Sequence, residues 1–189
     1  MSESSQLALV EQTETAKEPL VRPQNESRDI THTKERLVRP QNESRDVTHT
    51  IALVPPNYIS SLWFDVRDHL APAIDRSNGR WSLEHLYAAI ANGQQHLWLA
   101  FDKDNQIDGV GTTEIVRYPC QQMLAVQFLG GSKFNDWVWD MLDRFNGWAT
   151  DNGCAGIEVT GRHGFWKWLE QDGFNRTYTV YEKRLDNHE

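Results

Sequence analysis

Aromatic side chains are absent from the first part of this sequence. No Phe, Trp or Tyr occurs before Tyr58, whereas the 189-residue chain carries eight Trp, seven Phe and five Tyr in total. A segment without aromatic residues and with few aliphatic ones buries too little apolar surface to offset its conformational entropy. We therefore expect a disordered arm over residues 1–50 and one folded domain over residues 51–189.

Further absences exclude other classes of protein. No apolar run is long enough to span a membrane. The net charge is −8 and no basic cluster occurs, so binding to nucleic acid is not expected. The first residues lack the basic head and apolar core of a signal peptide, so secretion is not expected. Cys120 and Cys154 lie among apolar residues without metal-ligand spacing, and we expect buried free thiols and no metal site.

The expected arm contains a tandem 17-residue repeat. Lys17–Thr33 reads KEPLVRPQNESRDITHT, and Lys34–Thr50 reads KERLVRPQNESRDVTHT. Two such copies hold too few apolar residues to form a repeat-protein core. One interpretation is a duplicated linear motif that docks on a protein partner and gains avidity because the copies are tethered. The other is a recent duplication without function.

The docking anchors would be the apolar and basic residues at the start of each copy: Leu20, Val21, Arg22, Pro23, Leu37, Val38, Arg39 and Pro40. Each copy ends in a Thr-His-Thr triplet. Its histidine, His32 or His49, lies on the expected disordered arm without a Cys nearby and is expected to be a plain polar residue, not a metal ligand.

Hydrophobic periodicity predicts alternating strands and helices after the arm. Helices are expected after the capping residues Asn57 and Ser82, from Phe134 to the Asn152-Gly153 stop, and over Phe165–Gln171. Strands are expected at Ile51–Val54, His96–Phe101, Ile107–Tyr118, Met123–Leu129, Gly156–Thr160 and Thr177–Arg184. This order predicts an α/β fold, with a mixed sheet and helices on both faces.

The element order over residues 51–185 resembles the GNAT N-acetyltransferase superfamily. The most specific part is Met123–Leu185, which has a short helix ending in Gly173-Phe174 and a closing Glu182-Lys183-Arg184-Leu185. Within the superfamily, the sequence resembles a group of bacteriophage proteins in Asp75–Arg80 and in Glu158–Arg162. That likeness implies a protein of the host cytoplasm or the virion.

The resemblance implies acetyl-CoA as cofactor, bound where a central strand meets a long helix. Here that place holds Gly130, Gly131, Ser132 and Lys133, without the family's leading Gln or Arg. Backbone amides and a Lys could still hold an anion. The other interpretation is a plain strand-to-helix turn.

Other family landmarks are replaced. Arg162 stands at the family's Asn position, and Leu169 stands where a Tyr often protonates the leaving thiolate, which leucine cannot do. The candidates for a general base are Glu114 and Glu158, each of which also reads as a solvated or salt-bridged carboxylate.

Two classes of function follow from these patterns. The first is a structural or interaction protein of a symmetric bacteriophage assembly, with a degenerate GNAT-like domain that the repeat tethers to a protein partner. The alternative is an acetyl-CoA-dependent N-acyltransferase, or a domain that binds CoA without catalysis.

Overall fold

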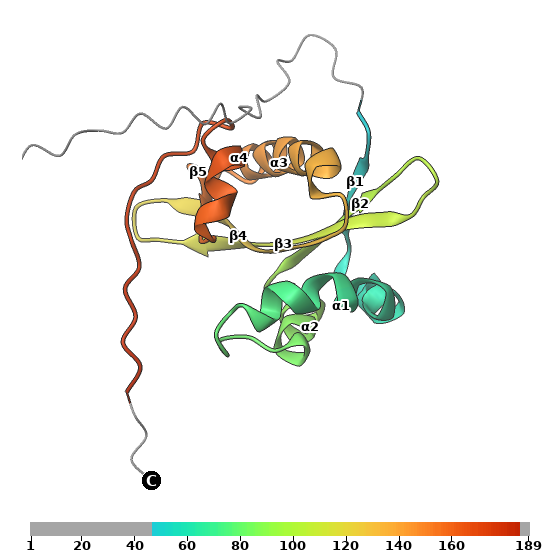
Figure 1. The fold of residues 1–189 in the computed structure, drawn as a ribbon, viewed down its shortest axis with the longest axis horizontal. Helices are drawn as coiled ribbons and strands as arrows, with labels where there is room; N and C mark the ends of the chain where they lie inside the picture. Colours follow the sequence, from blue (N-terminus) through green and yellow to red (C-terminus); the bar gives the residue numbers. More distant parts are fainter. Residues whose placement is uncertain (1–46, 186–189) are drawn as a thin grey trace, which may run out of the picture. The chain divides into compact units, whose positions relative to one another are not determined.

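The computed structural model describes residues 47–185, which form a five-stranded sheet flanked by helices (Figure 1). The strands are β1 (Thr50–Val54), β2 (His96–Phe101), β3 (Ile107–Arg117), β4 (Gln122–Gly131) and β5 (Gly156–Val159). The helices are α1 (Ile59–Asp75), α2 (Leu83–Ala91), α3 (Phe134–Asp151) and α4 (Trp166–Leu169), with 3-10 turns η1 (Pro56–Tyr58) and η2 (His163–Phe165). None of the helices in this range is long and apolar enough to cross a membrane.

The strands follow one another across the sheet in the order β1-β2-β3-β4-β5. Neighbours from β1 to β4 pair antiparallel, and β5 pairs parallel to β4. A parallel pair needs a long crossover connection, which α3 provides. The arrangement confirms the predicted mixed α/β sheet.

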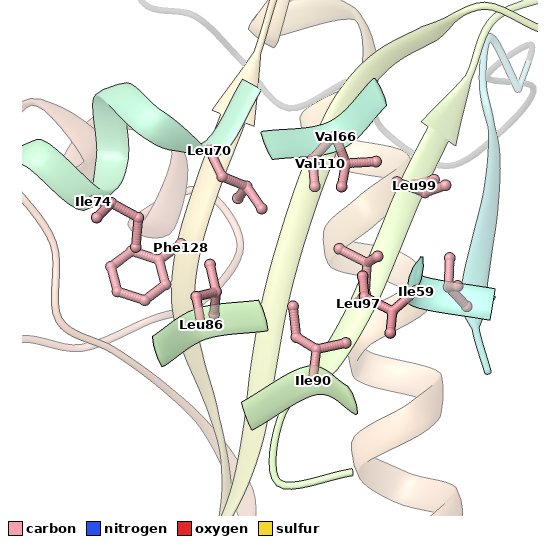
Figure 2. Packing of buried hydrophobic residues seen from close by; sticks show 11 residues of the cluster. Ile59, Val66, Leu70, Ile74, Leu86, Ile90, Leu97, Leu99, Val110 and Phe128 are labelled. Atoms are coloured by element: carbon pink, nitrogen blue, oxygen red, sulfur yellow. The ribbon is translucent and has the colours of Figure 1, made fainter. Parts of the chain in front are cut away.

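Helices α1 and α2 cover one face of the sheet. Val66, Leu70 and Ile74 recur every four residues along α1, so they share one side of the helix. Figure 2 shows these side chains pointing toward the sheet, where Val110 of β3 and Phe128 of β4 belong to the same buried cluster. The packing fixes α1 across the end of β4.

Helix α3 covers the opposite face (Figure 1). Trp137, Met141 and Phe145 again follow a four-residue spacing and are fully buried. The Phe145 ring meets the Trp98 ring of β2 edge to face, with centroids 5.3 Å apart. The Trp98 indole N–H donates to the Thr113 hydroxyl at 2.9 Å, so its polar atom is satisfied inside the core.

Two β-bulges interrupt the alternation of side chains along the sheet. Asp108 is the extra residue where β3 pairs with β2, and Gln127 is the extra residue where β4 pairs with β3. A bulge bends a strand and redirects its side chains. Val126 therefore packs on the α3 side of the sheet, whereas Phe128 packs on the α1 side. Pairing of β4 with β5 also ends at Val126, so no described strand covers that side of β4 after the bulge.

The predicted closing strand at Thr177–Arg184 is wrong. Residues 174–185 contain no strand and run past the α1–α2 connection, where Glu182 pairs with Arg80. An alternating pattern makes a strand only when a neighbouring backbone is available for pairing. The large apolar side chains of this segment are exposed: Tyr178, Val180, Tyr181 and Leu185.

Three smaller expectations also need correction. The predicted helix over Phe165–Gln171 is split into the 3-10 turn η2 and the single turn α4. Cys120 is exposed, because it follows Pro119 in the turn between β3 and β4, while Cys154 is partly buried. Burial raises the pKa of the Cys154 thiol.

Candidate functional site

A cavity of about 840 Å³ lies at the end of β4. Its walls come from the second half of α1, the β4–α3 connection, the first residues of α3 and the η2–α4 segment. Leu129, Gly130 and Gly131 of β4 also line it, after the point where β4 and β5 cease to pair. Backbone groups on the unpaired side of a strand are available to hydrogen-bond a ligand.

The cavity carries an excess of positive charge. Arg76, Arg162 and Lys167 line it, and Asp68 is the only acidic residue among its described walls. Arg162 and Lys167 lie over aromatic rings of the same wall, 5.6 Å and 3.9 Å from the ring centroids. None of these three cations forms an ion pair with another residue of the range 47–185. Concentrated charge of one sign in a cleft favours a ligand of the opposite sign, here an anion.

The predicted cofactor-binding residues lie at the rim of this cavity. Gly130, Gly131 and Ser132 line it, whereas Lys133 does not. A Cβ atom on Gly130 would lie 1.9 Å from the carbonyl oxygen of His69 in α1. A Cβ atom on Gly131 would lie 2.2 Å from a backbone oxygen of β3. The chain's own packing therefore requires glycine at both positions.

The start of α3 supplies other groups for an anion. No side chain caps this helix, so the N–H groups of its first turn have no such acceptor. Phe134 and Asn135, its first residues, line the cavity. The site therefore fits an anion held by side-chain cations and helix amides, with the glycines in a supporting role.

A buried carboxylate holds Lys133 away from the cavity. The Lys133 ammonium lies 3.0 Å and 3.2 Å from the two carboxylate oxygens of Asp108, the bulged residue of β3. The Ser132 hydroxyl and the Nε2 atom of His49 each reach the same carboxylate at 3.2 Å. The Lys133 ammonium, helped by these two donors, holds the pKa of Asp108 below its usual range. The same hydrogen bond raises the pKa of Lys133.

The expectation that His49 is a plain polar residue is wrong. His49 is buried, and its backbone N–H donates to Asp140 at 3.1 Å. The neighbouring Thr48 hydroxyl donates to the Asp136 carbonyl at 2.8 Å. The carboxylate partners of His49 come from β3 and α3, far away in the sequence, so local spacing did not reveal them. The expected domain start at Ile51 also lies inside β1, which begins at Thr50.

The rest of the repeat lies outside the described residues. This includes all of the predicted docking anchors, which are Leu20, Val21, Arg22, Pro23, Leu37, Val38, Arg39 and Pro40. Their role stays a prediction from the sequence.

The two predicted general bases lie in one row across the sheet. Ala125 of β4 pairs with Glu114 of β3 on one side and with Glu158 of β5 on the other. The bulged Gln127 donates to Glu114 at 3.2 Å. The Tyr118 hydroxyl donates to both oxygens of Glu158, at 3.0 Å and 3.1 Å, and this contact raises the pKa of the tyrosine. Neither carboxylate lines the cavity at the end of β4, which we call the cationic cavity. Glu114 pairs with β4 just before the bulge at Gln127, and the part of β4 after this bulge lines that cavity.

Sequence reasoning missed part of this site. Arg76 and Lys167 gave no motif, because Arg76 directly follows α1, Lys167 lies in α4, and the two meet only in the folded chain. Asp108 was missed because a bulged residue leaves no trace in the alternation of apolar and polar residues. Arg162 was noted as a departure from the family's Asn, and it lies in the cavity wall.

The sequence matches no protein-family model and no curated protein. Solved structures of similar fold include a predicted acetyltransferase with acetyl-CoA from Clostridium acetobutylicum, with a TM-score of 0.56 and 18% identity over 74% of this chain and 98% of that one. An aminoglycoside acetyltransferase from an uncultured soil metagenomic sample, in complex with sisomicin, has a TM-score of 0.54 and 14% identity, and the match covers 74% of this chain and 97% of that one. Glucosamine-6-phosphate N-acetyltransferase from Arabidopsis thaliana has a TM-score of 0.52 and 10% identity, and the match covers 74% of this chain and 99% of that one.

At these identities the likeness concerns the fold. It covers nearly the whole length of each of the three acetyltransferases. The described part of this chain has the fold of GNAT acetyltransferases.

Proposed function

We propose that this domain binds an acyl-CoA, with acetyl-CoA as the first candidate, and transfers the acyl group to an amine. The observation that carries the proposal is the cationic cavity at the end of β4, beside a strand edge without a neighbour among the described strands. Arg76, Arg162 and Lys167 would hold the phosphates, together with the first amides of α3. The bound thioester would supply an activated acyl group.

Glu114 is the better of the two candidate bases. Its hydrogen bond from Gln127 connects it to the point where β4 and β5 separate. Glu158 is engaged on both oxygens by Tyr118 and therefore has less capacity to accept a proton. Glu114 would take the proton of an incoming ammonium group and so supply the neutral amine. Leu169 has no proton to give, so the chain offers no replacement there for the family's tyrosine.

Calorimetric titration of the full chain with acetyl-CoA and CoA tests this function. We expect micromolar binding that Arg162→Ala and Arg76→Ala each weaken by about tenfold or more, because each removes a charge-assisted contact. Arg144→Ala is the matched control, since Arg144 is exposed on α3 and does not line the cavity. Absence of binding at millimolar ligand would exclude an acyl-CoA function.

A scaffold without catalysis is the second candidate. It is favoured by the glycine pair, whose missing side chains serve packing against α1 and β3. In this case the repeat would attach the domain to a protein partner, and a bacteriophage assembly is the context that the sequence resemblance implies. Deletion of residues 17–46 should then abolish incorporation into that assembly while the domain stays folded. Unchanged incorporation would contradict the scaffold role.

A further inference from the structure

A single buried carboxylate anchors the connection between β4 and α3. Asp108 is 6% exposed and does not itself line the cationic cavity. Its Oδ1 atom accepts from the Ser132 hydroxyl and the Lys133 ammonium, and its Oδ2 atom accepts from Lys133 and contacts Nε2 of His49. The backbone carbonyl of Asp108 also accepts from the Ser132 N–H at 2.8 Å. Two successive residues of the connection are therefore tied to one residue of β3.

The connection needs such an anchor because its backbone conformation is unfavourable. Lys133 has a φ of 47° and a ψ of 42°, in the left-handed region that residues with a side chain seldom adopt. A conformation of this kind persists where the surrounding contacts fix it. The side-chain contacts that do so here are the two hydrogen bonds from the Lys133 ammonium to Asp108. Without the carboxylate, we expect Lys133 to relax and the turn to change direction.

The direction of this turn determines where the first amides of α3 point. Phe134 and Asn135 directly follow Lys133, and both line the cationic cavity. Ser132, on the other side of Lys133, lines it as well. The Ser132 carbonyl accepts from the Trp137 indole N–H at 2.7 Å, which ties the turn to the buried face of α3. A change of conformation at Lys133 therefore moves groups of the cavity wall on both sides of it.

The charge of Asp108 alone acts against an anion site. A negative charge near the cationic cavity reduces the attraction of its cations for an anion. The ion pair at 3.0 Å also keeps the Lys133 ammonium out of the cavity. A carboxylate at this place favours anion binding only if its effect on the geometry of the turn outweighs the effect of its charge. The two effects have opposite signs, so an experiment can separate them.

We propose that Asp108 is a positioning residue of the anion site. Through Ser132 and Lys133 it holds the strand-to-helix connection in the conformation that directs the first amides of α3 toward the bound phosphates. Asp108 itself touches no ligand. The inference deepens the proposed acyl-CoA binding and rests on it.

Asp108→Asn tests the inference by calorimetric titration of the full chain with acetyl-CoA. The amide keeps the shape of the side chain and removes the charge that pairs with Lys133. We expect binding to be about tenfold weaker, because the turn loses its anchor. Removal of the negative charge without a change in geometry would instead make binding tighter. Unchanged or tighter binding therefore overturns the positioning role.

Asp136→Asn is the matched control for charge. Asp136 is exposed in the first turn of α3, does not line the cavity, and its carboxylate takes no part in the contacts of Asp108. The same change of charge at this position should leave acetyl-CoA binding unchanged or make it slightly tighter. Equal weakening by Asp136→Asn and Asp108→Asn would contradict a specific role of Asp108.

Amide hydrogen exchange in the chain without ligand separates positioning from a general loss of stability. The N–H groups of Ser132 and Asp136 donate to the carbonyls of Asp108 and Lys133, so they report on the turn itself. In Asp108→Asn these two amides should exchange faster, while the amides of β2 keep their protection. Equal acceleration in β2 would mean that Asp108 only stabilises the fold, and would overturn the positioning role.

Inorganic pyrophosphate is titrated into the same samples, because it carries phosphate charge without the rest of the cofactor. Acetyl-CoA binding that Asp108→Asn does not weaken overturns this inference and leaves the proposed function standing. Pyrophosphate binding that Asp108→Asn weakens, in a chain that binds no acetyl-CoA, supports the positioning role and overturns the acyl-CoA function. Absence of binding of both ligands to the unmodified chain overturns both.

Discussion

At the scale of single residues, Gly130 and Gly131 meet a packing requirement of the fold. In the sequence, a Gly-Gly pair between a strand and a helix is compatible both with phosphate binding and with a simple turn. In the structure, the space beside each Cα atom is filled by a carbonyl oxygen of the chain itself. Gly131 in addition has a φ of 133°, which side-chain-bearing residues rarely adopt.

Gly130→Ala should therefore destabilise the fold. The added methyl group would overlap the His69 backbone and push α1 away from β4, at a cost of about 1–3 kcal/mol or more. Urea unfolding measures the change, with Gly147→Ala as the matched control. Gly147 lies in α3 with open space around it, so alanine there should stabilise by about 0.5–1 kcal/mol. Equal stability of Gly130→Ala and the unmodified chain would contradict the packing role.

The candidate site could be predicted from the sequence only in part. Glu114, Glu158 and the Gly130–Ser132 loop were identified because they lie in or directly after patterned strands. The cations of the cavity were not predicted as a group, because Arg76, Arg162 and Lys167 come from three segments that only the fold brings together. Charge patterns detect neighbours in the sequence, and this site is made of neighbours in space.

At the scale of elements, the strands and helices with clear periodicity were predicted at nearly their observed positions. β2 matches its predicted range His96–Phe101, and α3 runs from Phe134 to the stop at Asn152. The bulges at Asp108 and Gln127 were not predicted, because a single extra residue looks like a local irregularity in the pattern. Yet the two bulged residues make contacts at the site: Asp108 binds the Lys133 ammonium, and Gln127 donates to Glu114.

The final segment is where local pattern and tertiary structure disagree. Residues 177–185 alternate like a strand, but they pair with no strand of the described part and are exposed throughout. Deleting Thr177–Glu189 should therefore leave the urea midpoint of the domain unchanged, because the deletion removes a surface ion pair between Arg80 and Glu182, and such pairs contribute little to stability. Arg80→Ala in the full chain is the control that removes this pair alone. A large decrease in the midpoint on deletion, but not in the control, would mean that the segment pairs with the sheet in solution.

At the scale of the whole molecule, the repeat and the domain share residues. The second copy ends in Thr48-His49-Thr50, and all three residues belong to the fold. The His49 side chain contacts the Asp108 carboxylate. Thr48 and the His49 backbone donate hydrogen bonds to α3, and Thr50 is the first residue of β1. The first copy ends in the same triplet, but Lys34-Glu35-Arg36 follows it instead of the apolar Ile51-Ala52-Leu53. Ile51 and Leu53 pack against the α3-side core. The second triplet therefore leads directly into β1, whereas the sequence after the first triplet is charged.

This difference between the triplets gives a matched pair of variants within one chain. His49→Ala removes the imidazole from the buried Asp108 carboxylate and leaves a small void, so it should lower the free energy of unfolding by about 1–3 kcal/mol. His32→Ala changes the same triplet in the first copy and should leave that free energy unaltered. Urea unfolding followed by tryptophan fluorescence measures both, because every Trp lies in the domain. Equal decreases would mean that both triplets contribute to the fold, and no decrease in His49→Ala would mean that the Asp108 cluster is stable without the repeat. A decrease confined to His49→Ala would mean that only the second triplet contributes to the stability of the domain. Experiments on partner binding should then begin with the first copy.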